Sequence, residues 1–293
     1  MEFTSNNLTF VIVTFNSRKV IYDCLNSLPK DFHKLIIENS SDEELKKELE
    51  QNYVNTRVIL SSNIGMGAGN NLGIKNMSSF FKNFSFGSKT GIDMPFESSG
   101  VLPSDEWKKK NVGYKWTDGD TVITGIGQGY FLATPLQLAY ATSIIANRGL
   151  ISIPKLNKDI QKEKNKKILE KEEFFKNNLK PEDWEIITNA MFDVVNKQNG
   201  TAFWSIRDKK NKIAGKTGTV QVYSLSQETD ERDDENIPDH LKDHSLYVAF
   251  APIDEPQIVI ATVVENVGSG SKFAAPISNK IINYYLDKVK ERY

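Results

Sequence analysis

The segment Ile213-Ala-Gly-Lys-Thr-Gly-Thr-Val-Gln-Val-Tyr223 decides the fold of the larger part of this sequence. It is the first of three apolar, β-branched segments that are predicted as strands, and Ser245–Ala251 and Gln257–Glu265 are the other two. Pro252–Pro256 joins the last two segments with the composition of a tight turn, which favours an antiparallel hairpin. An amphipathic helix is predicted over Phe273–Lys290. A helix packed on a C-terminal antiparallel sheet indicates an α+β fold.

Towards the N-terminus, this α+β region extends back to about residue 76. Thr134–Asn147 is predicted as a helix, because a proline lies in its first turn and it is apolar on most sides. Pro181–Asn196 is predicted as a second helix. Lys155–Lys171 is rich in lysine and is interpreted as a solvated loop or a frayed helix. Ser224–Asp243 is acidic and polar, and we expect it to form an exposed insertion.

Residues 1–75 follow a different pattern, in which strands and helices alternate. Leu8–Phe15, His33–Ile37 and Thr56–Leu60 are predicted as strands, with a helix between each pair. Strands that alternate with helices over short connections predict a parallel sheet with right-handed crossovers. The chain is therefore expected to contain an α/β segment over residues 1–75 and an α+β segment over residues 76–293.

The composition of the 293 residues excludes several classes of function. The 37 Lys and Arg residues nearly balance the 38 Asp and Glu residues, which argues against a nucleic-acid partner. Three histidines and one cysteine cannot form a zinc finger or a disulfide scaffold, and we predict no metal site. The longest N-terminal apolar run, Leu8–Phe15, is far short of the ~20 residues that span a bilayer. Without a signal or membrane anchor, the chain as it stands is expected in the cytoplasm.

A Lys-Thr-Gly-Thr tetrapeptide at the start of a predicted strand carries the chemistry of the larger segment. The ammonium group of Lys216 and the hydroxyl groups of Thr217 and Thr219 can bind a substrate carboxylate. Gly218 leaves room for a peptide along the strand edge, and the backbone N–H of Thr219 can supply half of an oxyanion hole. The tripeptide alone is a weak signal, because a second Lys-Thr-Gly at Lys89–Gly91 is not followed by a sustained strand.

The sequence around this tetrapeptide resembles a known family. The motifs that carry the resemblance are Phe86-Gly-Ser-Lys-Thr-Gly-Ile-Asp, Glu97-Ser-Ser-Gly, Trp107-Lys, Gly119–Tyr130, Thr134-Pro-Leu-Gln137, Asn199-Gly-Thr-Ala202 and Asp243–Pro252. In this order they resemble the C-terminal part of the transpeptidase domain of class B penicillin-binding proteins, of the penicillin-binding protein 2 type. The resemblance covers residues 76–293.

The resemblance implies a peptidoglycan D,D-transpeptidase, which cross-links stem peptides through a serine acyl-enzyme without a metal or organic cofactor. It implies a peptidoglycan stem peptide or a β-lactam as the ligand of Lys216, Thr217, Gly218 and Thr219. Gln128 lies in a loop that the family places near the acyl-enzyme site, although this residue could equally only shape the loop. The family also implies an inner-membrane protein with a periplasmic domain.

The nucleophile of this family is the serine of a Ser-x-x-Lys motif, which lies upstream of the region that resembles the family. The motif occurs four times, at Ser27, Ser79, Ser152 and Ser269, and so short a motif also matches by chance. Only Ser79, with Lys82 as its base, lies inside the resembling segment and before Lys216, and this pair is a weak candidate. We therefore expect the chain to be catalytically incomplete.

Three motifs in the first segment resemble a second family. Val13-Thr-Phe-Asn-Ser, Glu38-Asn-Ser-Ser and the glycine-rich stretch over residues 63–73 resemble the start of family 2 glycosyltransferases, as in rhamnosyltransferase-like members, over residues 8–75. The resemblance implies a partial GT-A, Rossmann-like parallel sheet that binds a nucleotide-sugar. The residues that would line the nucleotide pocket are Thr14, Asn16, Glu38 and Asn70, with Glu38 at a position where the family has Asp.

These motifs also have simpler interpretations, as a helix cap after a strand and a glycine-rich tight turn. The metal-binding Asp-x-Asp pattern of the glycosyltransferases does not follow them, and a divalent cation is what neutralises a nucleotide diphosphate leaving group. We do not expect sugar transfer from this segment. The alternatives to a transpeptidase-like protein are a nucleotide-sugar-binding fragment and a non-functional fusion of two gene fragments.

Overall fold

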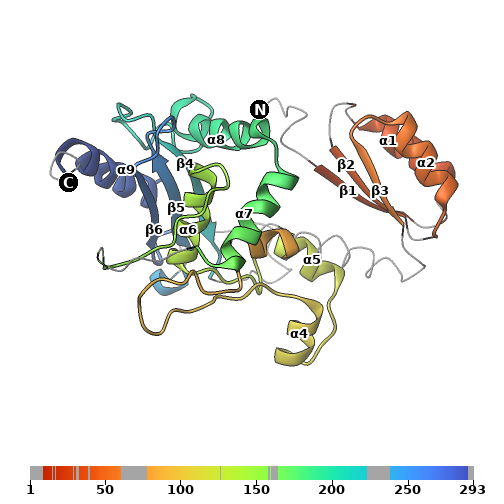
Figure 1. Ribbon diagram of the computed structural model, residues 1–293, viewed down its shortest axis with the longest axis horizontal. Helices are drawn as coiled ribbons and strands as arrows, with labels where there is room; N and C mark the ends of the chain where they lie inside the picture. Colours follow the sequence, from red (N-terminus) through yellow and green to blue (C-terminus); the bar gives the residue numbers. More distant parts are fainter. Residues whose placement is uncertain are drawn as a thin grey trace. The chain divides into compact units, whose positions relative to one another are not determined.

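The structure is a computed structural model that forms two compact units (Figure 1). It describes residues 9–14, 16, 18–28, 30, 33–38, 40–60, 78–125, 127–157, 159, 164–222 and 238–289. The first unit contains Met1–Lys82 and Leu102–Phe131, and the second contains Asn83–Val101 and Leu132–Tyr293. The predicted boundary near residue 75 lies outside the described residues and stays a prediction.

A three-stranded parallel sheet forms the N-terminal part of the first unit. The elements follow in the order β1 (Thr9–Thr14), α1 (Arg18–Ser27), β2 (His33–Glu38), α2 (Glu43–Asn52) and β3 (Thr56–Leu60). The strands pair in the order β1-β2-β3, which confirms the predicted parallel sheet. The two helices and the sheet share one apolar core, made of Ile21, Leu25, Ile36, Leu45, Leu49 and Val58.

Two short helices of the first unit, α4 (Asp105–Asn111) and α5 (Asp118–Gly125), were not predicted from the sequence. They are joined by an ion pair between Lys108 Nζ and Asp120 Oδ2, 2.5 Å apart, with both side chains largely buried. Burial opposes ionisation of Asp120, but hydrogen bonds from Lys108 and Thr117 outweigh it and lower the pKa of this carboxyl. The carboxylate of Asp120 therefore binds groups of the helix pair itself. In the described part of the chain, no three His, Cys, Asp or Glu residues gather in a group that could hold a metal ion.

An antiparallel sheet forms the centre of the second unit. Its strands β4 (Ala214–Val220), β5 (His244–Ala251) and β6 (Ile258–Val264) pair in the order β4-β5-β6, as the sequence predicts. Helix α9 (Ala274–Tyr284) lies on one side of this sheet, and α6 (Pro135–Ala146) and α8 (Pro181–Asn196) lie on the other (Figure 1).

Strand β5 is buried on both sides, which makes it the centre of this core. Tyr247, Ala249 and Ala251 pack with residues of α9, and Phe250 packs with Ala146 of α6 and Met191 of α8. A continuous apolar run such as this one is typical of a strand that is covered on both faces. The chain continues after α9 as one π-helical turn (Tyr285–Val289), and a 3₁₀ turn (Asp239–Leu241) precedes β5.

The predicted helices of the second unit are confirmed, with one difference. In α6, the side chain of Thr134 accepts from Gln137 N and the side chain of Gln137 accepts from Thr134 N, which forms a capping box. The interpretation of Lys155–Lys171 as a solvated loop or frayed helix is wrong at its C-terminal end, where the regular helix α7 (Lys166–Asn178) begins. The physical reason is Phe175, beyond the lysine run, which is fully buried and packs edge-on against Phe84 and Trp184.

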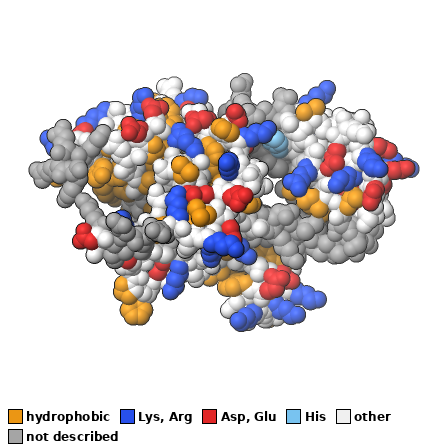
Figure 2. Space-filling view, in the orientation of Figure 1, with side chains coloured by type: hydrophobic (Ala, Val, Ile, Leu, Met, Phe, Trp, Pro, Cys, Tyr) orange, Lys and Arg blue, Asp and Glu red, His pale blue; other side chains and the backbone are white. Residues whose placement is uncertain are grey.

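The charges on the surface are mixed, as the balanced composition predicts. On the face of the molecule drawn in Figure 2, basic and acidic side chains are interspersed. None of the helices in the described ranges has the length and apolar character needed to cross a membrane.

Candidate functional site

Strand β4 carries the Lys-Thr-Gly-Thr tetrapeptide at an open edge of the antiparallel sheet. It pairs with β5 on one side, and no described strand pairs with its other edge. The side chain of Lys216 is exposed overall, and its Nζ donates to the carbonyl oxygen of Thr217 at 2.7 Å. Partial burial of the ammonium group lowers the pKa of Lys216. The strand thus presents a cation along an edge with which no described strand pairs.

Thr217 is held by a contact that the sequence analysis did not predict. Its Oγ1 lies 2.9 Å from Oγ1 of Thr201, in the turn that follows α8. That turn is tight, because an added Cβ at Gly200 would lie 2.3 Å from the carbonyl oxygen of Val194. Ala202 is fully buried, and its N–H donates to the same oxygen at 3.0 Å. The motif Asn199-Gly-Thr-Ala202 therefore positions a hydroxyl group beside the tetrapeptide.

Gly218 lies where another part of the chain approaches the backbone of β4. An added Cβ at Gly270 would lie 2.2 Å from the carbonyl oxygen of Gly218 and 2.4 Å from that of Leu246. Ser245 Oγ donates to the carbonyl oxygen of Ser269 at 3.0 Å and so fixes the same loop to β5. The glycine-rich loop before α9 therefore supports the strand that carries the tetrapeptide.

The second Lys-Thr-Gly, at residues 89–91, has a different environment. It lies outside the strands, and both the N–H and the hydroxyl group of Thr90 donate to Oε1 of Glu97 at 2.6 Å. The N–H of Gly91 donates to the other carboxylate oxygen at 3.1 Å. Burial of Glu97 opposes its ionisation, but these hydrogen bonds outweigh the burial and lower its pKa. This copy of the tripeptide therefore has a structural part, because its hydrogen bonds to Glu97 close the loop between them.

The Glu97→Gln variant is expected to be less stable than the wild type by about 2 kcal/mol at pH 7, because hydrogen bonds to a buried charged acceptor are lost. The pKa of Glu97 is lowered by folding, so its stabilising effect is complete above the ordinary glutamate pKa and is lost as the pH falls through the lower folded value. Urea unfolding at pH 7 and at about pH 3 measures the difference. A stability difference that stays constant between the two pH values would contradict this account.

The other predicted transpeptidase residues lie in the first unit. Ser79 and Lys82 are both exposed on a helical turn over residues 78–83. Gln128 is half-buried in the turn after α5, where its N–H donates to the carbonyl oxygen of Ile123 at 3.0 Å. Neither the candidate nucleophile nor the role of Gln128 is tested by these positions, and both stay predictions.

Three of the four predicted nucleotide-pocket residues are described, and they lie at or just after the ends of the parallel strands. Thr14 and Glu38 are register partners at the ends of β1 and β2. Asn16 is exposed, and its N–H donates to the hydroxyl group of Ser40. Glu38 is fully buried, and its carboxylate accepts from the N–H and hydroxyl groups of Ser40 and from the N–H of Asp42. Asn70 lies outside the described residues.

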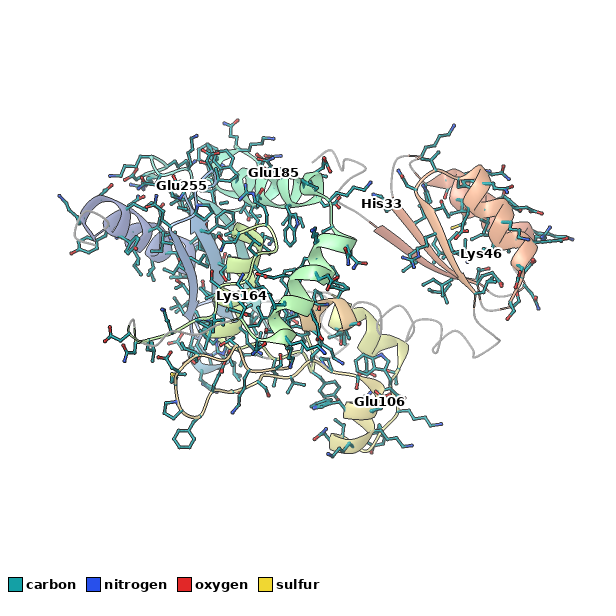
Figure 3. All side chains as sticks on the ribbon, in the orientation of Figure 1. His33, Lys46, Glu106, Lys164, Glu185 and Glu255 are labelled. Carbon is teal, nitrogen blue, oxygen red and sulfur yellow. The ribbon has the colours of Figure 1, made fainter. Side chains whose placement is uncertain are left out.

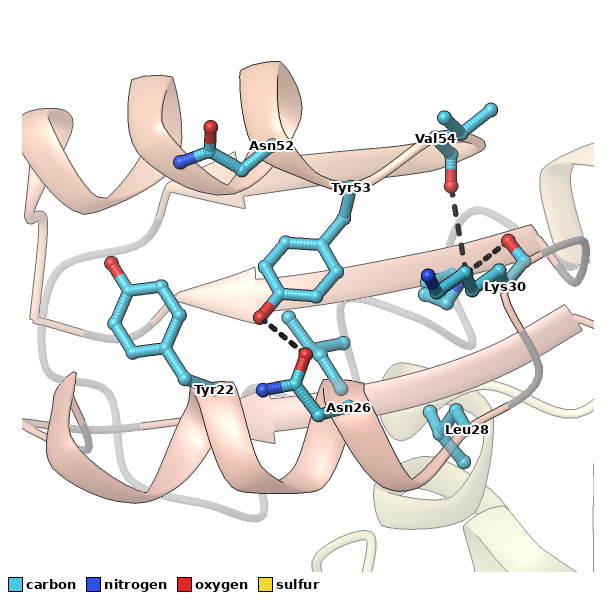
Figure 4. Close-up of a pocket in the computed structure, with 9 residues that line it drawn as sticks. Tyr22, Asn26, Leu28, Lys30, Asn52, Tyr53 and Val54 are labelled. Carbon is cyan, nitrogen blue, oxygen red and sulfur yellow. Dashed lines mark hydrogen bonds between the residues drawn. The ribbon is translucent and has the colours of Figure 1, made fainter.

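A cavity of about 460 Å³ lies at the opposite end of the same sheet (Figure 4). It is next to the starts of β2 and β3, where Lys34 Nζ donates to the carbonyl oxygens of Lys30 and Val54 at 3.0 and 3.5 Å. Tyr53 donates from its hydroxyl group to Asn26 across this cavity. Because the strands are parallel, Thr14 and Glu38 lie at the other edge, so the cavity is distinct from the predicted nucleotide pocket.

Comparisons with known proteins place this chain in a family. The model of the penicillin binding protein transpeptidase domain matches residues 31–283. The chain belongs to the penicillin-binding protein transpeptidase family. The peptidoglycan D,D-transpeptidase MrdA of Haemophilus influenzae is 40% identical over 223 residues, which cover 74% of this chain and 34% of that protein. MrdA of Escherichia coli is 36% identical over 219 residues, with coverages of 74% and 34%.

Solved structures of the same family share the α+β fold with its antiparallel C-terminal sheet. A complex between penicillin-binding protein PBP2 and MreC from Helicobacter pylori matches with a TM-score of 0.61 and 32% identity, covering 73% of this chain and 36% of that chain. PBP2 of Pseudomonas aeruginosa, in complex with WCK 5153, matches with a TM-score of 0.57 and 34% identity, covering 75% and 46%.

The chain spans about a third of the length of the curated relatives it matches. The family match begins at residue 31 and so includes β2 and β3, which the sequence analysis placed in a glycosyltransferase-like segment. The comparisons give no support to that second resemblance. The parallel sheet itself is confirmed, whereas the nucleotide-sugar ligand stays a prediction.

Proposed function

We propose that this chain supplies the substrate-binding strand of a peptidoglycan D,D-transpeptidase site, with a peptidoglycan stem peptide or a β-lactam as its ligand. The single observation that carries the proposal is the open edge of β4, along which Lys216, Thr217 and Thr219 follow one another. An extended peptide can add to such an edge through main-chain hydrogen bonds. The relatives named peptidoglycan D,D-transpeptidase support the choice of ligand.

Each residue of the tetrapeptide has a separate part in this proposal. The partly buried ammonium group of Lys216 attracts the ligand carboxylate, and a charge-assisted hydrogen bond of this kind is stronger than a neutral one. The hydroxyl group of Thr217 is oriented by Thr201, and Thr219 contributes a hydroxyl group and a backbone N–H. Gly218 leaves the edge open for the ligand backbone.

Binding of a synthetic stem peptide, followed by isothermal titration calorimetry, tests the proposal. The Lys216→Gln variant is expected to weaken binding about tenfold, since a hydrogen bond to a charged group contributes about 1.5 kcal/mol or more. Lys212→Gln is the matched control, because Lys212 forms an exposed ion pair with Asp254 just before β4. Equal affinity of the wild type and Lys216→Gln would overturn the assignment of the strand.

We also propose that the chain does not itself form an acyl-enzyme, because its Ser-x-x-Lys matches lack the context of the family's nucleophile. Incubation with a labelled penicillin, followed by mass spectrometry of the peptides, tests this separately from binding. The expected result is reversible binding without a covalent adduct. A penicilloyl adduct on any serine would contradict it, and an adduct on Ser79 would identify Ser79 and Lys82 as the missing pair.

A nucleotide-sugar is a second candidate ligand, for the parallel sheet of the first unit. The observation that favours it is the buried hydroxyl group of Thr14, for which no hydrogen-bond partner is found within the described residues, next to Glu38 in the register. Calorimetric titration with UDP and dTDP tests this candidate. The absence of heat at millimolar ligand would remove it.

A further inference from the structure

A serine and a lysine that are far apart in the sequence meet inside the second unit. Lys171, in the second turn of α7, donates from Nζ to Oγ of Ser85 at 2.8 Å. Ser85 is 2% exposed, whereas Lys171 is half-buried on the helix surface. The buried hydroxyl group of Tyr140, on α6, also interacts with the side chain of Ser85, which partly offsets the rise that burial causes in the pKa of Tyr140. One amine and two hydroxyl groups thus form a cluster that the proposed substrate-binding strand does not use.

The backbone around Ser85 holds this cluster in one position. Ser85 has a φ of 68°, a left-handed conformation that favours glycine, so a serine here is strained. Its carbonyl oxygen accepts from Gln137 Nε2 at 3.0 Å and from Ser88 N at 3.1 Å, which fixes the segment against α6. The helix that carries Lys171 is fixed as well, because Phe175, one turn later on α7, is fully buried.

The charges around the amine favour its neutral form. Burial, and to a smaller extent repulsion by Lys167, one turn earlier on α7, lower the pKa of Lys171 to about 8. The nearby acidic groups are Glu97 and Glu172, which both act on Tyr140. Glu97 is bonded to Thr90 and Gly91, and Glu172 to Lys164 and to the N–H of Ile151. Lys164, the partner of Glu172, lies just before α7 and is labelled in Figure 3.

We propose that Lys171, held against the hydroxyl group of Ser85, is a site of covalent acylation by small activated acyl donors such as acyl phosphates. The neutral amine attacks the carbonyl carbon of the donor, so that an N–C bond forms and the C–O bond to phosphate breaks. Phosphate leaves with the electron pair and takes up the proton that the nitrogen loses. The product is a neutral amide, which no longer carries the ammonium charge next to Ser85.

Lys171 differs from an ordinary surface lysine in the fraction of its amine that is neutral. An exposed lysine with an ordinary pKa of about 10.4 is almost entirely protonated at pH 8, whereas Lys171 is about half neutral. Only the neutral amine is a nucleophile. Lys171 is half-buried rather than fully buried, and Ser85 Oγ accepts an N–H from its amine.

Treatment of the full chain with acetyl phosphate, with acetylation at each lysine quantified by peptide mass spectrometry, tests the proposal. Lys167 is the matched internal control, since it lies on the same helix and is exposed. At pH 8, Lys171 is expected to be acetylated about fivefold faster than Lys167 or more. Its rate should level off above about pH 8. A rate at Lys171 equal to or below that at Lys167 would overturn the proposal.

The Ser85→Gly variant tests the part played by the hydroxyl group. Glycine suits the left-handed backbone at this position, so the variant is expected to fold, and circular dichroism with a thermal melt checks this. Most of the excess rate at Lys171 should be lost, and the pH at which its rate levels off should shift. Lys167→Arg keeps the neighbouring positive charge and should leave the rate at Lys171 within about twofold of the wild type. An unchanged rate and pH profile in Ser85→Gly would remove Ser85 from the site.

Discussion

Replacing Gly270 by alanine is expected to destabilise the second unit by at least about 3 kcal/mol, because the added methyl group overlaps main-chain atoms. It would lie 2.2 Å from the carbonyl oxygen of Gly218 and 2.4 Å from that of Leu246. Both oxygens belong to paired strands, so neither can move away as the end of a flexible side chain could. For a unit of this size, the melting temperature should fall by about 6 °C or more.

Ser271→Ala is the control for this prediction. Its hydroxyl group lies 2.9 Å from that of Ser269 in the same loop, and losing it should cost no more than about 1 kcal/mol. Denaturant unfolding of the two variants, followed by the fluorescence of the tryptophans, separates the effects. If the melting temperature of Gly270→Ala stayed within about 2 °C of the wild type, the loop before α9 would not lie in close contact with the main chain of β4.

The antiparallel sheet and its helices could be predicted from the sequence because their signals are local. Apolar runs bounded by turn residues define β4, β5 and β6, and proline in the first turn marks the starts of α6 and α8. The alternation of strands and helices likewise predicted the parallel sheet. In each case neighbours in the sequence are sufficient to determine the element.

The contacts that build the candidate site could not be predicted in the same way. Thr201 and Thr217 belong to different elements, and the motif that contains Thr201 gave no indication of a partner. The segment Lys155–Lys171, which contains the start of α7, was interpreted as a solvated loop or frayed helix because it is rich in lysine, and the serine that accepts from Lys171 is 86 residues away. Glu38 was predicted as a nucleotide contact from the resemblance to glycosyltransferases, whereas three groups of the loop that follows it, on Ser40 and Asp42, donate to its carboxylate.

Gln137→Glu is expected to have a comparably large effect, because one buried amide holds three separate carbonyl groups. Gln137 is fully buried, and the two N–H bonds of its Nε2 are shared among the carbonyl oxygens of Ser85, Ser88 and Ser99, at 3.0, 2.9 and 2.7 Å. A carboxylate in this place has no hydrogen to donate and puts its negative charge against three acceptors. At pH 7 we expect a loss of at least about 3 kcal/mol, as is typical of an unpaired buried charge.

A second variant separates the charge from the lost hydrogen bonds. Gln137→Met is uncharged and of similar length, so it should be less stable than the wild type but more stable than Gln137→Glu at pH 7. Burial raises the pKa of an introduced carboxyl, and its protonated form can again donate one hydrogen bond. The deficit of Gln137→Glu relative to the wild type should therefore shrink as the pH falls towards 5, while that of Gln137→Met stays constant. If the two variants were equally stable at both pH values, repulsion between the carboxylate and the carbonyl groups would not be the cause, and the amide would act only by filling space between α6 and the loop that begins at Ser85.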